Sequence, residues 1–204
     1  MLLRTLLILS TQCMLCTATA LAQSRSTPPR ISAEAKQLNV FVGKWTAEGE
    51  IKSGPMGAGG ELLIARSCNW TYDGIGVLCH EIDTIPGIGK VSHVILMSYD
   101  AHTSDYVLFN ASNMGHIRIC RGTVSGDIWT WTGEHTMGSQ RIQLRLTQKW
   151  TSKDSFDFKD EGGPDANSMT LTTDGKGTRV RTPAGHALRN KSSAANISRP
   201  AGLH

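Results

Sequence analysis

The chain has 204 residues, with 21 Lys and Arg against 17 Asp and Glu and a formal net charge of +4. Beyond the N-terminal stretch no run of residues is apolar enough to cross a bilayer, so no transmembrane segment is expected. About 150 residues remain once the two chain ends are set aside, which is enough for one domain with a sizeable core.

The N-terminus predicts export. Arg4 supplies a short positive region, an apolar stretch runs from Leu6 to Leu21, and Ala20-Leu21-Ala22 has the small-x-small pattern of a cleavage site. Polar residues interrupt the apolar stretch, which is also short for a membrane anchor. We therefore expect a signal peptide at residues 1–22, a linker at 23–35 and a periplasmic or secreted mature protein.

The C-terminus is basic. From Lys176 onward the chain has six Lys and Arg residues and no Asp or Glu. Residues 182–204 are rich in Ala, Ser, Asn, Gly and Pro without periodicity, which predicts a disordered tail. A basic tail can adhere to nucleic acid or anionic lipid. A solvated terminus is the simpler expectation, and an exported protein is not expected to have a nucleic-acid partner.

Between these ends the sequence predicts an all-β domain at residues 36–181, preceded by a short helix within Ala33–Phe41. Apolar stretches alternate with Gly, Pro and Asp-Gly turn signals at roughly 10–12-residue spacing, which indicates an antiparallel sandwich or barrel. Consecutive short hairpins favour an up-and-down meander barrel of about ten strands. The expected strands are 44–53, 61–72, 75–84, 90–99, 105–113, 116–124, 127–135, 140–151, 154–160 and 167–173.

The strongest hairpin signal is Asp73-Gly74, because both central residues of a type I′ turn need positive φ. Counting outward from this turn places Cys68 directly opposite Cys79. Opposed Cα atoms on antiparallel strands lie ~4.5–5.5 Å apart, within the range of a disulfide. The pair therefore predicts a disulfide and an oxidising compartment, with Cys120 left as the free cysteine.

Alternation in 141–150 shows which face of the sheet is inside. Two-residue turns at Met137-Gly138 and Ser125-Gly126 would place Trp131 opposite Cys120, Gly133 opposite Arg118 and His135 opposite His116. The expected interior set is His116, Arg118, Cys120, Trp129, Trp131, His135 and Gln148.

Arg118 is the most informative member of this set, because a guanidinium is rarely buried without a partner. It predicts either an internal carboxylate or an acidic group on a ligand. His116 and His135 would lie near the barrel mouth, where two imidazoles could share a metal ion or hold a haem edge. Two ligands are too few for a closed zinc site, so a solvated pair at the rim is expected and no metal is assigned.

Two further expectations concern the surface. Glu48, Glu50 and Glu81 could supply acid–base chemistry if one pointed inward, but no partner is visible and an exterior position is expected. Strands 90–99, 105–113 and 116–124 are apolar on both faces, so their outer face needs cover. The N-terminal helix or a second subunit would supply it, and the latter predicts a homodimer.

Several motifs carry a family resemblance. The segment from Leu38 to Trp45 resembles the Gly-x-Trp opening of calycin-like barrels. Together with Cys68-Asn69-Trp70, Gly76-Val77-Leu78-Cys79, Ser98-Tyr99-Asp100, Gly126-Asp127-Ile128-Trp129-Thr130-Trp131 and Phe156-Asp157-Phe158, it is similar to the bacterial domain-of-unknown-function family 1579.

That resemblance implies an antiparallel, lipocalin-like barrel and carries no established activity. Gly43 would allow a tight start to the first strand, and Trp45 would plug the closed end. The calycin pattern implies a late arginine stacked on this tryptophan, either Arg179 or Arg181. The first strand is also similar to that of nitrobindin-type haem barrels, but no histidine here matches their haem ligand.

The leading functional hypothesis is an exported protein that binds a small, apolar or lipid-like ligand, with an acidic group near Arg118. The expected ligand-binding residues are Arg118, Trp129, Trp131, His116, His135 and Gln148. The alternatives are a barrel isomerase or hydrolase that uses an interior Glu or His, a haem-binding barrel, and a solid structural barrel. No nucleophile, phosphate or zinc motif is present in the mature chain, so no catalytic residue and no cofactor are assigned.

Overall fold

The computed structural model describes residues 31–54, 58–71, 73–137 and 139–181. The expected signal peptide, the first part of the expected linker and the expected basic tail lie outside these residues.

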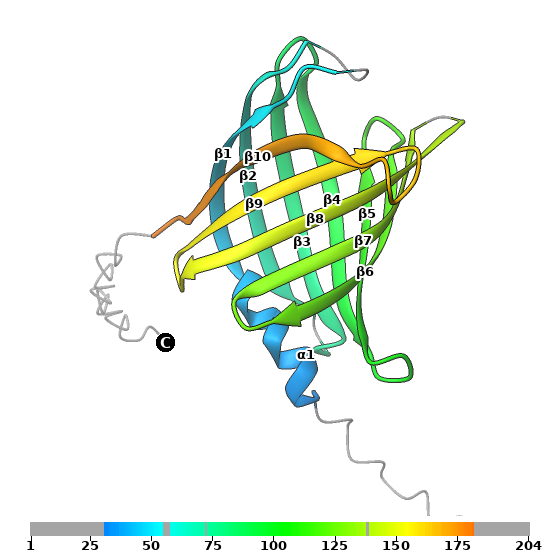
Figure 1. Cartoon of the computed structure of the whole chain (residues 1–204). Coiled ribbons are helices and arrows are strands. Elements are labelled where there is room, and N and C mark those ends of the chain that lie inside the picture. Colours follow the sequence, from blue (N-terminus) through cyan, green and yellow to red (C-terminus); the bar gives the residue numbers. More distant parts are fainter. Residues whose placement is uncertain (1–30, 55–57, 72, 138, 182–204) are drawn as a thin grey trace, which may run out of the picture. The chain divides into compact units, whose positions relative to one another are not determined.

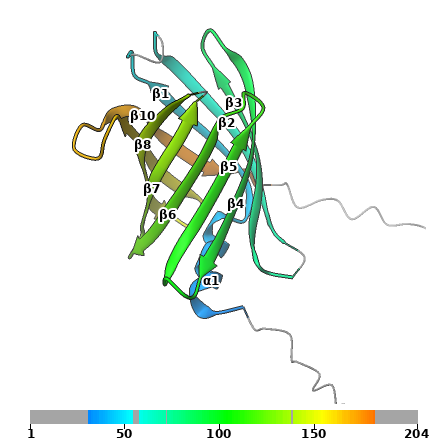
Figure 2. The same cartoon turned by 90° about the vertical axis from the view of Figure 1, so that its right-hand side faces the viewer.

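Ten antiparallel strands close into a barrel in which each strand pairs with its neighbours in sequence and β1 pairs with β10 (Figures 1 and 2). The ten-strand up-and-down barrel is thus confirmed. The strands are β1 Gly43–Ile51, β2 Gly60–Trp70, β3 Gly76–Ile85, β4 Gly89–Asp100, β5 Asp105–Ser112, β6 Ile117–Ser125, β7 Ile128–Met137, β8 Gln140–Ser152, β9 Ser155–Gly163 and β10 Thr170–Arg179.

A short helix lies at one end of the barrel (Figure 1). Helix α1 (Ala33–Gln37) is capped by the Ser32 hydroxyl and continues into the 3-10 turn η1 (Leu38–Phe41). Leu38 and Phe41 are buried in the barrel end, and the Tyr106 hydroxyl donates to the Glu34 carbonyl over 2.9 Å. The helix therefore closes the end of the barrel. The expectation that it covers the outer face of β4–β6 is wrong.

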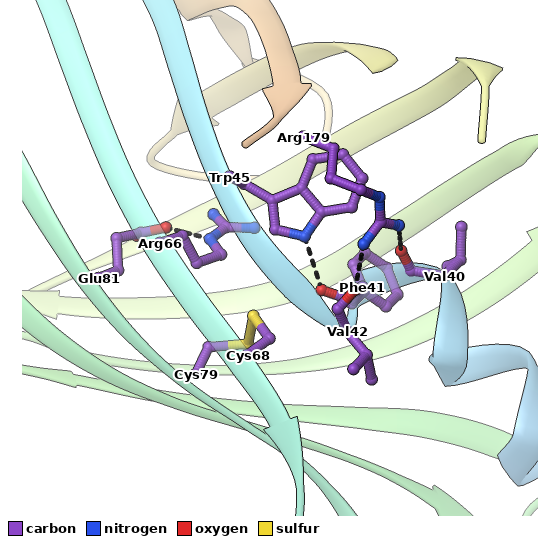
Figure 3. Close-up of a disulfide and its surroundings, with 9 residues drawn as sticks. All are labelled: Val40, Phe41, Val42, Trp45, Arg66, Cys68, Cys79, Glu81 and Arg179. Atoms are coloured by element: carbon purple, nitrogen blue, oxygen red, sulfur yellow. Dashed lines mark hydrogen bonds and ion pairs between the residues drawn. A yellow bond between two sulfur atoms is a disulfide. The ribbon is translucent and has the colours of Figure 1, made fainter. Parts of the chain in front are cut away.

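The β2–β3 hairpin has the predicted register. Cys68 lies opposite Cys79 and the two form a disulfide (Figure 3). The predicted two-residue type I′ turn at Asp73-Gly74 is wrong, although Gly74 has the positive φ, +72°, that such a turn needs. The Thr71 amide donates instead to the Gly76 carbonyl over 2.9 Å, so the loop is longer by one residue on each side. A symmetric extension of this kind leaves the strand pairing unchanged.

The turns predicted at Ser125-Gly126 and Met137-Gly138 each lie one residue too early in the sequence. Ser125 pairs with Ile128 and Met137 with Gln140, so Arg118 faces His135 rather than Gly133. The glycine of the first turn, Gly126, has φ of +61° and stands first in the loop, where a type II′ turn prefers it. Each correction slides the pairing by two residues, and side chains alternate with a period of two, so the predicted inward faces are unchanged.

The last strand was predicted too short. Asp174-Gly175 was interpreted as a turn, but β10 runs through it to Arg179. The glycines of this strand are needed for close packing, because a Cβ on Gly177 would overlap the Phe156 ring and one on Gly175 would overlap the Phe158 ring.

Aromatic side chains fill the half of the barrel next to the helix. Phe41 packs edge-on against Trp129 and Trp150, with ring centroids 4.9 and 5.7 Å apart, and Trp45 lies 5.1 Å from Trp150. The Arg179 guanidinium lies over Trp45, with its carbon 4.0 Å from the ring centroid, and its Nη1 and Nη2 donate to the backbone carbonyls of Val42 and Val40 (Figure 3). Arg181 pairs instead with Asp154.

Gly43 completes this corner. Its φ is +127° and its α-carbon faces the Arg179 side chain, which a Cβ would displace. The aromatic cluster, with Arg179 stacked on Trp45, therefore fills the helix end of the barrel. We call it the aromatic plug.

Candidate functional site

The other half of the barrel is hollow. A cavity of about 220 Å³ lies between the aromatic plug and the turns at residues 86–88 and 113–116. Ile88 and Met114 stand at this end and are exposed. Much of the wall is apolar and includes Ile51, Leu62, Ile64, Ile85, Val91, Leu146 and Phe158.

Two rows of polar side chains interrupt the apolar wall, and we call them together the polar girdle. In the first row Arg66 on β2 lies opposite Glu81 on β3, which lies opposite His93 on β4. In the second row Asn110 on β5 lies opposite Arg118 on β6, which lies opposite His135 on β7. Asp83, Gln148 and Asp160 complete the girdle.

Both girdle arginines have carboxylate partners. Arg66 Nε donates to Glu81 Oε2 (Figure 3), and Arg118 Nη1 donates to Asp160 Oδ2 over 3.1 Å. Burial raises the pKa of Asp160 above its ordinary value, and the positive charge of Arg118 opposes that rise. An internal carboxylate, one of the two partners expected for Arg118, is thus present.

His93 lies between two polar side chains. Its Nδ1 is 3.2 Å from Asn110 Oδ1 and its Nε2 is 3.2 Å from Asp83 Oδ2. Burial lowers the pKa of His93, but the adjacent Asp83 carboxylate outweighs it, so the net shift is upward. The second oxygen, Asp83 Oδ1, is buried and has no hydrogen-bond partner.

The predicted pairing of His116 directly opposite His135 is wrong, because Arg118 takes that position, but the two imidazole rings are in contact, with centroids 5.3 Å apart. His135 is only 7% exposed, so it is not the solvated rim residue that was expected. Burial, reinforced by the charge of Arg118, lowers the pKa of His135 to about 3 and lowers that of His116 as well. The His135 imidazole is therefore neutral at physiological pH, and its Nε2 is buried without a partner.

The expected ligand-binding residues divide between the two halves. Arg118, His116, His135 and Gln148 line the cavity. Trp129 does not line it, because its ring packs in the aromatic plug. Trp131 borders a separate void of about 50 Å³ together with the buried Cys120. Burial raises the pKa of the Cys120 thiol to about 11, so it is a neutral, inert side chain.

Six girdle residues were not predicted: Arg66, Glu81, Asp83, His93, Asn110 and Asp160. The expectation that Glu81 lies outside is wrong, since it is 5% exposed and faces the cavity. For three of these residues the sequence did contain a signal. The inward Cys68–Cys79 pair fixes the parity of β2 and β3, so Arg66, Glu81 and Asp83 must share its face. By contrast Glu48 and Glu50 are exposed, as expected.

The fold and site define a ten-strand closed antiparallel barrel with a plugged end and a cavity at the other. The family described as "Protein of unknown function (DUF1579)" matches residues 30–185, which include every described helix and strand. The chain therefore belongs to this family.

Among solved structures, the chain is similar to the crystal structure of Rv2717c from M. tuberculosis, with a TM-score of 0.55 and 13% sequence identity. The match covers 74% of this chain and 99% of that one. At this identity the likeness concerns the fold alone. No curated protein matches the chain.

Among the described residues, no helix has both the length and the apolar character needed to span a membrane.

Proposed function

We propose that this protein is an exported barrel that binds a small, mostly apolar ligand in its internal cavity. The observation that carries the proposal is the cavity of about 220 Å³ with apolar walls and a polar girdle. Ligand sites are typically concave and mostly apolar, with a few polar groups that fix orientation.

The girdle suggests which end of the ligand is polar. Arg118 is already neutralised by Asp160, so an acidic group would have to compete with a carboxylate that is part of the wall. Asp83 Oδ1 is a buried acceptor atom without a partner, and His135 Nε2 is a buried ring nitrogen without one. Since unpaired buried acceptors cost free energy, a ligand that donates hydrogen bonds, through a hydroxyl or an amine, would relieve that cost.

Export is supported by the disulfide, since such bonds persist in oxidising compartments. The homodimer expectation is supported by a row of exposed apolar side chains on the outer face, where Leu96, Phe109 and Ile119 lie directly opposite one another on β4, β5 and β6. The proposal assigns no catalytic residue and needs no haem.

Native mass spectrometry of the protein, purified without detergent, tests the proposal. A small molecule should accompany the folded barrel and be released on denaturation. Ala47→Phe places a ring in the cavity, because Ala47 lines it, and should reduce the bound fraction roughly ten-fold or more. Ala65→Phe is the matched control, because Ala65 lies on the exposed face of the adjacent strand. Equal ligand occupancy in both variants would contradict an internal site.

A further inference from the structure

Three potential metal ligands gather on one side of the cavity. Glu81 and Asp83 are two residues apart on the inner face of β3, and His93 lies directly opposite Glu81 on β4. One ligand atom from each side chain lies within 4.8 Å of the other two. We propose that Glu81, Asp83 and His93 form a site for a divalent transition-metal ion on the cavity wall. The site does not depend on the proposed organic ligand.

A hydrogen bond to Asn110 orients the His93 ring. The Asn110 carbonyl oxygen can only accept, so His93 Nδ1 carries a proton and donates to it over 3.2 Å. This contact fixes the ring and the tautomer, so that Nε2 of the neutral imidazole presents a lone pair. Metal-bound histidines are commonly held in this way by a hydrogen bond from the other ring nitrogen.

His93 Nε2 faces the carboxylate of Asp83. Asp83 Oδ2 is 3.2 Å away, yet Nε2 has no partner with hydrogen-bond geometry, and Asp83 Oδ1 has no partner at all. With the imidazole neutral, the Nε2 lone pair and the Asp83 carboxylate repel each other unless a proton or a metal ion lies between them. A metal ion ligated by His93 Nε2 and an Asp83 oxygen would supply that charge.

The positive charges of the polar girdle are already paired with carboxylates. Arg66 pairs with Glu81, and Arg118 pairs with Asp160. Within the described part of the chain, Asp83 is the girdle carboxylate that has no arginine partner. Arg66 donates to Glu81 Oε2, so Oε1 of the same carboxylate is the oxygen that remains for an ion.

The donor set indicates the class of metal. Two carboxylates and one imidazole suit Zn²⁺, Mn²⁺ or Fe²⁺, whereas Ca²⁺ and Mg²⁺ prefer oxygen ligands alone. Three protein ligands leave at least one coordination position open toward the cavity, where water or a polar ligand group would bind.

The test uses the untagged full-length protein, stripped of metal with a chelator and then equilibrated with Zn²⁺. After removal of free metal, wild type should retain one equivalent by elemental mass spectrometry. Asp83→Asn and His93→Gln should each lose that equivalent. His80→Gln is the matched control and should retain it, because His80 lies next to Glu81 on the exposed face of β3. Asn110→Ala, which removes only the orienting contact, should weaken binding about 10–100-fold.

A second measurement does not depend on the variants folding. Co²⁺ added to the stripped wild type should give a visible d–d spectrum typical of nitrogen and oxygen ligation, and excess Zn²⁺ should abolish it. The proposal is overturned if wild type retains no zinc and gives no cobalt spectrum. It is equally overturned if folded Asp83→Asn and His93→Gln retain as much zinc as wild type.

Discussion

Both arginines in the wall of this barrel are paired with carboxylates, and this pairing determines which atoms are free to meet a ligand. Arg118, the residue that the sequence singled out, is engaged with Asp160 at 3.1 Å. Removing one partner of such a pair leaves an uncompensated buried charge, which costs several kcal/mol. The side chains with unpartnered atoms are therefore the better candidates for recognition, and among them are Asp83 and His135.

The first prediction concerns the pH dependence of stability. The pKa of His135 is lowered to about 3 in the folded protein, from its ordinary value of 6.5, chiefly by burial. Between these values the unfolded state binds more protons, so the free energy of unfolding falls as the pH is lowered through this window. The contribution of this one group has a slope of at most ~1.4 kcal/mol per pH unit.

His135→Gln removes that contribution. Urea unfolding at several pH values between 7.5 and 5 should show wild type losing about 2 kcal/mol more than the variant over this range. The curves of both proteins will also contain changes from other groups, so the difference between them is the quantity to compare. Parallel curves would show that His135 is protonated as easily in the folded as in the unfolded protein.

At the scale of strands and turns, the sequence predicted what depends on parity and missed what depends on tertiary contacts. Three turns were placed or built incorrectly, yet the inward faces predicted for β6, β7 and β8 were right, because each error moved the register by zero or two residues. Asp174-Gly175 has the composition of a turn, but the Phe158 ring packs on Gly175 and the strand continues. Glu81 was expected outside because its partner Arg66 was not recognised, although the predicted Cys68–Cys79 register places Arg66 directly opposite it on the adjacent strand.

The second prediction concerns the hairpin of β2 and β3. Cys68 and Cys79 are separated by 11 residues in sequence, and the chain-entropy model gives about 3 kcal/mol of stabilisation for a loop of that length. The double variant Cys68→Ala/Cys79→Ala should lose roughly that amount in urea unfolding and keep its far-ultraviolet circular dichroism. Addition of a reductant should destabilise wild type and leave the double variant unchanged. Equal sensitivity of the two proteins would mean that this disulfide does not stabilise the fold.

The barrel as a whole combines a solid end with a hollow end. The sequence predicted the solid end well, because Gly43 and Trp45 open the first strand in a pattern typical of such barrels. It did not predict the cavity, since the volume left empty depends on the packing of many side chains at once. Trp129 and Trp131 were expected to line the ligand site only because they lie on the inner face of the sheet. The inner face lines both the aromatic plug and the cavity, so it does not distinguish them.

The third prediction concerns assembly. Phe109 is 40% and Ile119 58% exposed on the outer face of the sheet, and contiguous exposed apolar patches commonly mark interaction sites. We expect a homodimer through this face, seen by light scattering at high micromolar concentration. Ile119→Lys should yield monomer without loss of fold, because its side chain is already exposed. Wild type that is monomeric under the same conditions would rule out the dimer.

The internal site is tested most directly by titrating the protein with the neutral fluorescent probe N-phenyl-1-naphthylamine, which is apolar and has one N–H donor. Wild type and Ala65→Phe should bind it saturably with equal affinity and enhance its fluorescence. Ala47→Phe should bind it roughly ten-fold or more weakly, because the added ring occupies the cavity. Absence of saturable binding to wild type, or the same affinity in Ala47→Phe, would contradict the account of a ligand-binding barrel.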